Sequence, residues 1–152
     1  ILSQHVPPHI LQPSSVRRTK APEEDFADQY AAREADKLAD RGVLVSIGAH
    51  GQEEGLGSHW ELWSFARGGM TPLEALRTAT VAPAIHLGFI QDIGTLEPGK
   101  LADLVVLNAN PLDDIRNSDD ISAVMLNGRY YDAVTMDEQF TGDAERAPYY
   151  WE

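Results

Sequence analysis

The sequence predicts an α/β fold in which helices and an extended segment precede a small antiparallel β unit. Residues 22–42 have an acidic start, apolar residues at helical spacing and a closing glycine, which together predict an amphipathic helix. Residues 43–47 form an apolar, β-branched run directly after this helix, as expected of a buried parallel strand. Asn127-Gly128 lies between two strand-like runs, and this dipeptide is the strongest short signal for a β-hairpin.

A single parallel strand cannot satisfy its own backbone, because its N–H and C=O groups need neighbouring strands. Residues 43–47 therefore predict further strands supplied from elsewhere. The loop at residues 50–57 is rich in glycine, and Ser58 with Glu61 then has the Ser-x-x-Glu form of a capping box. We expect a helix from this box to about Arg67.

A second capping box follows in the run Thr71-Pro72-Leu73-Glu74, where proline occupies the first helical position. Apolar residues recur at helical spacing after it, which predicts another helix. Residues 83–87 predict a further short helical piece, and Gly88 closes it. The chain between residues 58 and 88 is therefore expected to be mainly helical.

The period changes from helix to strand after Gly88. Residues 97–100 have the sequence Glu-Pro-Gly-Lys, which is typical of a type II turn, and residues 101–107 predict a strand. Two more strands are expected at residues 121–126 and 129–131, on either side of the hairpin turn. Residues 135–138 predict a last helical turn before an aperiodic tail.

The composition excludes several classes of partner. The chain of 152 residues has a formal net charge of −12, which repels the phosphate backbone of nucleic acids and anionic membrane surfaces. No apolar run approaches the roughly 18 residues of a membrane span. Cysteine is absent, so a metal would have to be held by His, Asp or Glu. The first residue is Ile1 and no secretion signal follows, so we expect a piece of a longer polypeptide.

Two runs past the centre of the chain carry a family resemblance. They are residues 68–80, which contain Ala-Leu-Arg-Thr-Ala-Thr, and residues 94–107, which contain Pro-Gly-Lys-Leu-Ala-Asp-Leu-Val-Val. Both resemble the C-terminal end of amidohydrolase-superfamily enzymes, the metal-dependent hydrolases related to imidazolonepropionase and dihydroorotase. The Pro-Gly-Lys motif itself is explained by a turn and a buried strand. We therefore expect its residues to have a structural role and no catalytic one.

The resemblance implies a division of the chain into three parts. Residues 1–88 would be the last elements of a (β/α)8 TIM barrel, residues 89–134 strands of the small β-sandwich that flanks the barrel, and residues 135–152 a C-terminal tail. The chain would then be a C-terminal fragment of the fold. Its partners would be the remainder of the barrel or a partner chain, and we expect a homo-oligomer.

The resemblance also implies an activity, the hydrolysis of amide or cyclic amide C–N bonds with zinc or another divalent metal in the complete enzyme. The superfamily's His-x-His pair on the first strand, and its ligands on the middle strands, have no counterpart in this sequence. We therefore expect the isolated segment to be inactive, possessing no complete metal site. The sequence does not identify the substrate or the compartment.

His50 is the candidate catalytic residue. It follows the predicted strand, at the place where most members of the superfamily have a metal-associated aspartate, so the usual mechanism would be altered. Histidine can act as a base or bind zinc near neutral pH. His50 and His59 are the candidate metal ligands, although a loop position and a helix start explain the two residues equally well. For His86 and Asp103 we expect structural roles.

Two other classes of function stay open. The chain could be a non-catalytic structural or oligomerisation module, since exposed sheet edges favour association. It could also be a metal-binding protein without turnover, built from His50, His59 and either His5 or His9. The two prolines between His5 and His9 argue against a helical ligand pair there.

Overall fold

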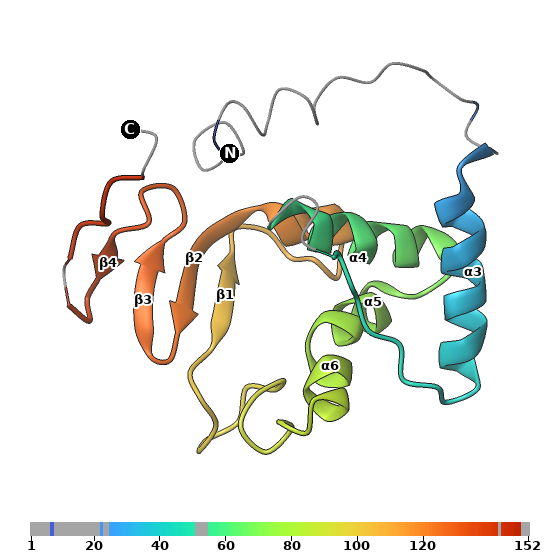
Figure 1. The fold of residues 1–152 in the computed structure, drawn as a ribbon, viewed down its shortest axis with the longest axis horizontal. Helices are drawn as coiled ribbons and strands as arrows, with labels where there is room; N and C mark the ends of the chain where they lie inside the picture. The colour runs from blue at the N-terminus through green and yellow to red at the C-terminus, as the bar shows by residue number, and fades with distance from the viewer. Residues whose placement is uncertain (1–6, 8–21, 23–24, 51–54, 143, 150–152) are drawn as a thin grey trace.

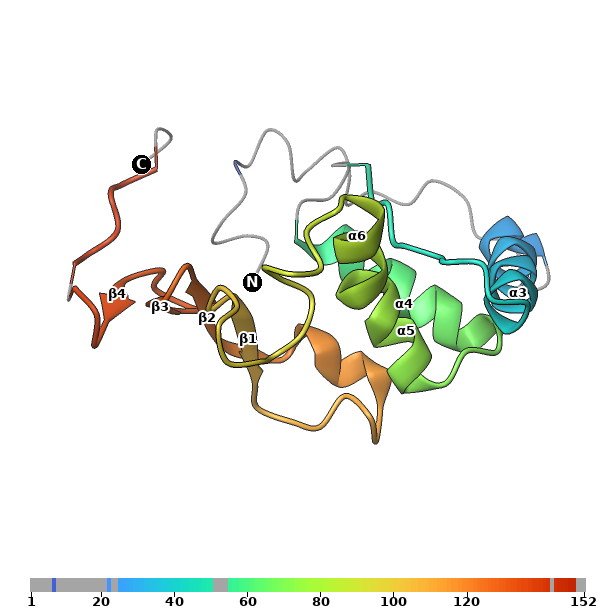
Figure 2. The same cartoon turned by 90° about the horizontal axis from the view of Figure 1, so that it is seen from below.

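The computed structural model describes Pro7, Pro22 and residues 25–50, 55–142 and 144–149. His5, His9 and most of the predicted glycine-rich loop lie outside the described residues. A group of four α-helices lies beside an antiparallel sheet of four strands (Figure 1). Figure 2 shows the same division from below, with helix α3 on the far side of the helical group from the sheet. The fold is mixed α/β, as the sequence predicts.

Helix α3 (Ala27–Asp40) confirms the first predicted helix. It begins after Phe26, later than the predicted start at Pro22. It ends just before Gly42, the glycine that the sequence predicts as its terminator. Gly42 has a φ of 82°, and its amide donates to the Ala39 carbonyl at 2.8 Å. Only glycine adopts this backbone conformation without steric cost, which is why the helix stops there.

Helix α4 (Leu56–Gly68) confirms the second predicted helix but not its capping box. The residue before the first helical turn is Gly55, with a φ of 78°, and no side chain of the described residues caps the helix. Ser58 lies inside the helix, and the Glu61 carboxylate accepts a hydrogen bond from the Gly48 amide instead. The capping-box prediction at Ser58 is wrong because the flexible Gly55 lets the helix begin three residues earlier.

Helix α5 (Pro72–Ala79) starts at the second capping box, which is confirmed. The Glu74 amide donates to the Thr71 hydroxyl at 3.3 Å, and the Thr71 amide donates to the Glu74 carboxylate at 2.8 Å. Both amides would otherwise lack partners at the helix start. Helix α6 (Val81–His86) follows at the position of the predicted short helical piece.

The strand predicted at residues 43–47 does not form in this structure. The segment joins α3 to α4 without strand pairing (Figure 1), and the side chains of Val43 and Leu44 are 49% and 44% exposed. The amides of Leu44 and Val45 have no hydrogen-bond partner among the described residues. The strand prediction is wrong for the chain alone, because a parallel strand needs neighbours that the described residues do not supply.

The sheet follows the helices and contains β1 (Leu104–Leu107), β2 (Ile121–Leu126), β3 (Arg129–Asp132) and β4 (Glu138–Gln139). Its strands are antiparallel and lie in chain order. The hairpin is confirmed, with φ values of 49° at Asn127 and 78° at Gly128, as a type I′ turn requires.

The helical turn predicted at residues 135–138 is wrong. The Asp132 carboxylate accepts hydrogen bonds from the amides of Val134 and Thr135, both at 2.8 Å, and so forms a turn that leads into β4. Local hydrogen bonding by aspartate competes with helix formation in this way.

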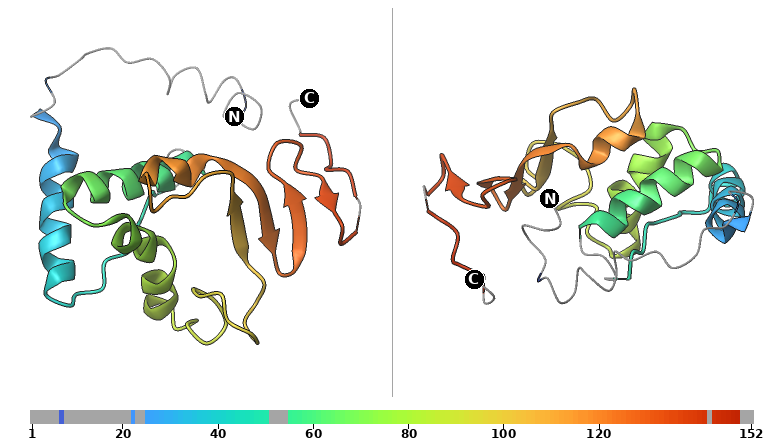
Figure 3. Two further views of the ribbon diagram at one scale, coloured as in Figure 1. Left: turned by 180° about the vertical axis from the view of Figure 1, so that it is seen from behind. Right: turned by 90° about the horizontal axis from the view of Figure 1, so that it is seen from above.

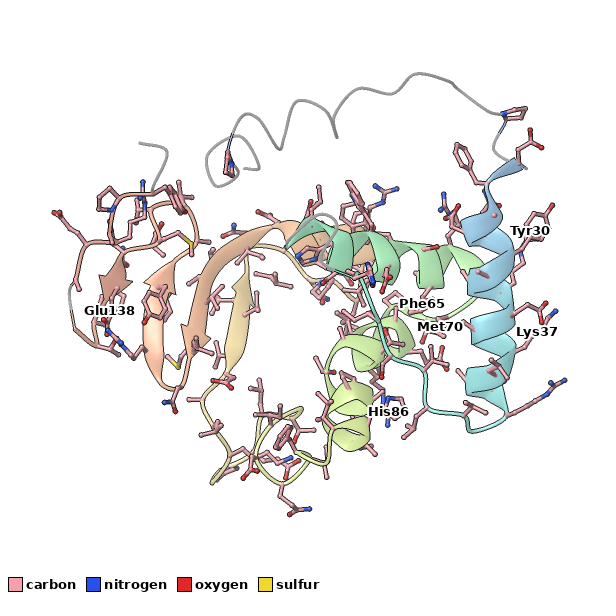
Figure 4. The ribbon with its side chains drawn as sticks, in the orientation of Figure 1. Tyr30, Lys37, Phe65, Met70, His86 and Glu138 are labelled. Carbon is pink, nitrogen blue, oxygen red and sulfur yellow. The ribbon has the colours of Figure 1, made fainter. Side chains whose placement is uncertain are left out.

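The core lies between the helices and is small. Its buried members are Leu62, Met70, Ala75 and Ile115, and Figure 4 shows Met70 with Phe65 beside it. Ile115 comes from the 3-10 helix η2 (Ile115–Asp119), which lies between β1 and β2 in the sequence and packs on α4, as seen from behind in Figure 3. Through Ile115, the core therefore connects the segment between β1 and β2 to the helices. Within the part of the chain that the structure describes, no helix is both long and apolar enough to cross a membrane.

Candidate active site

Three successive residues at the end of the segment after α3 are each hydrogen-bonded to a different helix. The Ser46 hydroxyl lies 2.8 Å from Nδ1 of His86 on α6, and the Ile47 amide donates to the Thr78 carbonyl on α5 at 3.0 Å. The Gly48 amide donates to the Glu61 carboxylate on α4 at 2.5 Å. The end of this segment is therefore fixed against the helices, although the amides of Leu44 and Val45 have no partner among the described residues.

His50 lies two residues beyond the last of these attachments. It forms a turn with a φ of 58°, and its side chain is exposed. A positive φ is uncommon for a residue other than glycine and is found more often at asparagine, aspartate and histidine. Because the side chain is exposed, the imidazole is available to a substrate or to another part of a larger site.

An open groove of about 580 Å³ lies between α3 and α4, beside this turn. Its walls are mainly apolar, with alanines on α3 and with Trp60 and Phe65 on α4. Two carboxylates, Asp28 and Glu61, also line it, but both already have partners. Asp28 pairs with Arg67, and Glu61 holds the Gly48 amide. The groove therefore offers apolar contact rather than free charge.

His59 lies on α4 and faces η2. Its Nδ1 atom is 3.1 Å from the Ser118 hydroxyl, which also accepts a hydrogen bond from the Trp63 indole at 3.0 Å. Burial lowers the pKa of His59 from its ordinary value of 6.5, and the nearby Asp119 carboxylate acts in the opposite direction. The ring is therefore neutral at neutral pH, and one of its two nitrogen atoms is occupied by the contact with η2.

The described residues do not form a metal centre by themselves. No group of three or more His, Asp or Glu side chains capable of holding a metal is found in residues 25–50, 55–142 and 144–149. His50 contributes one exposed imidazole, and His59 contributes one nitrogen that Ser118 does not occupy. This donor set does not fit a metal site of the superfamily, and the metal roles of His50 and His59 stay predictions.

The remaining candidates have structural contacts. His86 points from α6 toward the segment that carries Ser46 (Figure 4). The Asp103 carboxylate accepts a hydrogen bond from the Asn127 amide at 2.5 Å and so holds the hairpin turn against β1. The structural hydrogen bond expected of Asp103 is confirmed, whereas His86 is exposed and its structural role stays a prediction.

The sequence does not indicate that Glu61 contacts Gly48 or that Ser118 contacts His59. The spacing of Ser58 and Glu61 assigns the glutamate to a local capping box, and nothing in the sequence connects Glu61 to Gly48 across the glycine-rich loop. Ser118 lies 59 residues from His59, and no local pattern joins the two. Both contacts depend on the packing of elements that are distant in the chain.

Comparison with known proteins identifies the family. The model described as "Amidohydrolase family" matches residues 11–130, which is more than half of the chain. The chain therefore belongs to the amidohydrolase family. It is 36% identical over 93 residues to the imidazolonepropionase of Thermoplasma acidophilum, a match that covers 59% of this chain and 23% of that protein. It is also 36% identical over 76 residues to the ochratoxinase of Aspergillus niger, covering 49% of this chain and 16% of that protein.

Solved structures of amidohydrolases with the TIM-barrel fold resemble the computed structure. A Xaa-Pro dipeptidase with bound methionine in its active site has a TM-score of 0.60 at 28% identity, covering 68% of this chain and 25% of that one. A putative prolidase from Bifidobacterium longum has a TM-score of 0.56 at 32% identity, covering 74% and 27%. The chain spans about a quarter or less of the length of these proteins and of the two curated relatives.

Proposed function

We propose that this chain is the C-terminal portion of a metal-dependent amidohydrolase that hydrolyses amide or cyclic amide C–N bonds. In this proposal the chain has no turnover alone and acts with the remainder of a TIM barrel, supplied by a longer polypeptide or by a partner chain. The family and the relatives support hydrolysis of C–N bonds. The observation that carries the proposal is the segment of residues 43–47, which has no strand neighbour among the described residues and precedes His50.

This segment has the composition of a strand but lacks strand neighbours. The side chains of Val43 and Leu44 are 49% and 44% exposed, and the amides of Leu44 and Val45 have no partner among the described residues. Exposed β-branched and apolar side chains beside unpaired amides are typical of a strand edge. Neighbouring strands of a barrel would pair the backbone on both sides and cover these side chains. The segment would then be the last strand of the barrel, with His50 at the end where barrel enzymes form their active sites.

His50 is the proposed catalytic residue. A neutral imidazole has one nitrogen atom that can accept a proton from an attacking water molecule, and histidine does so near neutral pH. Members of the superfamily generally use divalent metals, which supply a Lewis acid for this chemistry when bound. Because the described residues do not assemble a metal centre, the donors would have to come largely from the rest of the barrel.

The antiparallel sheet is the proposed remnant of the small β-sandwich. Val105 and Leu126 are 53% and 60% exposed, which leaves apolar side chains without cover on the sheet. A sheet in a sandwich buries one face against a second sheet about 10 Å away. Strands from the same missing portion of the enzyme would supply that second sheet.

A non-catalytic structural or oligomerisation module is the second candidate. The same exposed apolar side chains favour it, together with the outer edge of β1, which has no strand neighbour among the described residues. Open strand edges promote pairing with another chain. A homo-oligomer of the isolated chain is therefore expected, and sedimentation would detect it. A well-folded monomer would contradict this expectation.

Hydrolysis assays separate the two candidates. The 152-residue chain and a polypeptide that also contains the rest of the barrel are tested on Xaa-Pro dipeptides and imidazolonepropionate, the compounds that the names of a neighbour and a relative suggest. We expect turnover of at least one compound by the longer polypeptide and none by the chain alone. His50→Ala should abolish turnover, whereas Glu34→Ala, on the exposed face of α3, should not. An inactive longer polypeptide would favour the second candidate.

A further inference from the structure

The hydrogen bond between Gly48 and Glu61 lies at the base of the loop that carries His50. The two residues are 13 positions apart, and the loop between them includes the turn at His50. Glu61 is half-buried on the second turn of α4. Its carboxylate therefore connects the end of the extended segment to a helix whose position is fixed by the core residue Leu62.

The distance along the chain from this hydrogen bond to His50 is short. Two residues span at most about 7 Å, so fixing the Gly48 amide restricts where the His50 imidazole can lie. The other two attachments, at Ser46 and Ile47, are further from His50 along the chain. A charged acceptor also makes a stronger hydrogen bond to an amide than a neutral one does. Among the three attachments, the one made by Glu61 has the most direct control over the turn.

We propose that Glu61 is a positioning residue, which holds the turn carrying His50 in place through the Gly48 amide. This inference rests on the proposed function, since it assigns Glu61 a role in the reaction of the complete enzyme. Glu61 acts through Gly48, and the structure gives it no contact with His50 itself. Removing its carboxylate releases the base of the loop and leaves α4 and its core contacts intact.

The hydrogen bond can be tested in the 152-residue chain without an activity assay. Glu61→Ala removes the acceptor, while Glu61→Gln keeps an oxygen atom at the same position. Amide hydrogen exchange at Gly48, followed by NMR, should accelerate at least about tenfold in Glu61→Ala and stay close to wild type in Glu61→Gln. Glu34→Ala, which removes an exposed carboxylate on α3, should leave Gly48 unchanged. Equal exchange at Gly48 in wild type and Glu61→Ala would overturn the proposal.

The role in the reaction is tested in the polypeptide that contains the whole barrel. Displacement of a catalytic group by about 1 Å can lower the rate by about 100-fold, so Glu61→Ala should reduce kcat by about 10- to 100-fold with a smaller change in KM. Glu61→Gln should restore most of kcat, which a variant that only lost stability would not explain. An active wild type with an equally active Glu61→Ala, or a Glu61→Gln as slow as Glu61→Ala, would overturn the positioning role alone. An inactive wild type would refute the proposed function instead.

Discussion

Replacing Gly68 with alanine places a methyl group where the end of α4 meets α3. An added Cβ atom would lie 2.6 Å from the carbonyl carbon of Ala32, 2.6 Å from its Cβ and 2.9 Å from its carbonyl oxygen. Carbon atoms that are not bonded pack best at about 3.5–4.0 Å. Because two of the three atoms belong to the backbone of α3, no side-chain rotation relieves the contact, and the two helices must move apart.

The size of the effect follows from two opposing terms. Overpacking of a tight contact costs about 1–3 kcal/mol, while alanine is favoured over glycine in a helix by up to about 1 kcal/mol. We therefore expect Gly68→Ala to lower the free energy of unfolding by about 1–2 kcal/mol. In a protein of this size that change corresponds to a fall in Tm of about 3–6 °C. Urea unfolding followed by circular dichroism would measure it.

Gly48→Ala is the matched control for this substitution. An added Cβ at Gly48 would meet nothing within 4 Å, and the φ at this position is not in the left-handed region. The control should change the free energy of unfolding by less than about 0.5 kcal/mol. A Gly68→Ala variant as stable as wild type, or more stable, would refute the close approach of α3 and α4.

Two further predictions concern local hydrogen bonds. Thr71→Ala removes the cap of α5 and should lower the free energy of unfolding by about 1 kcal/mol, measured by urea unfolding, and an unchanged midpoint would count against the capping box. Hydrogen bonds from Arg129 and Thr141 lower the pKa of Glu138 below its ordinary value of 4.5. A depressed pKa gives stability that is present above pH 4.5 and is lost as the pH falls through the lowered pKa. In Glu138→Gln the free energy of unfolding should therefore fall less steeply as the pH is lowered below 4.5. An equally steep fall in the variant and in wild type would contradict this role of Glu138.

Local signals in the sequence predicted the elements that depend on neighbouring residues. The end of α3 at Gly42, the start of α5 at Thr71 and the Asn127-Gly128 turn each need only a backbone conformation or a nearby side chain. Their partners are within a few residues, so a local pattern is enough to predict them. The sequence is therefore a good guide to these helix ends and turns, although the local patterns at Ser58 and at residues 135–138 give wrong predictions.

Elements and contacts that depend on distant partners were not predictable in the same way. The run at residues 43–47 has the composition of a strand, but whether a strand forms depends on neighbours outside the described residues. The attachments of Ser46 to His86 and of Gly48 to Glu61 join residues 40 and 13 positions apart. The place of His50 after the extended segment could be predicted, whereas the residue that holds its turn could not.

Amide hydrogen exchange at Leu44 and Val45 tests most directly whether this chain supplies one strand of a larger barrel. Neither amide has a partner among the described residues, so both should exchange rapidly in the 152-residue chain. In a polypeptide that contains the rest of the barrel, exchange at both amides should slow by about 100-fold or more. Equal exchange in the two proteins, whether fast or slow, would contradict the proposal that residues 43–47 form a strand of a larger barrel.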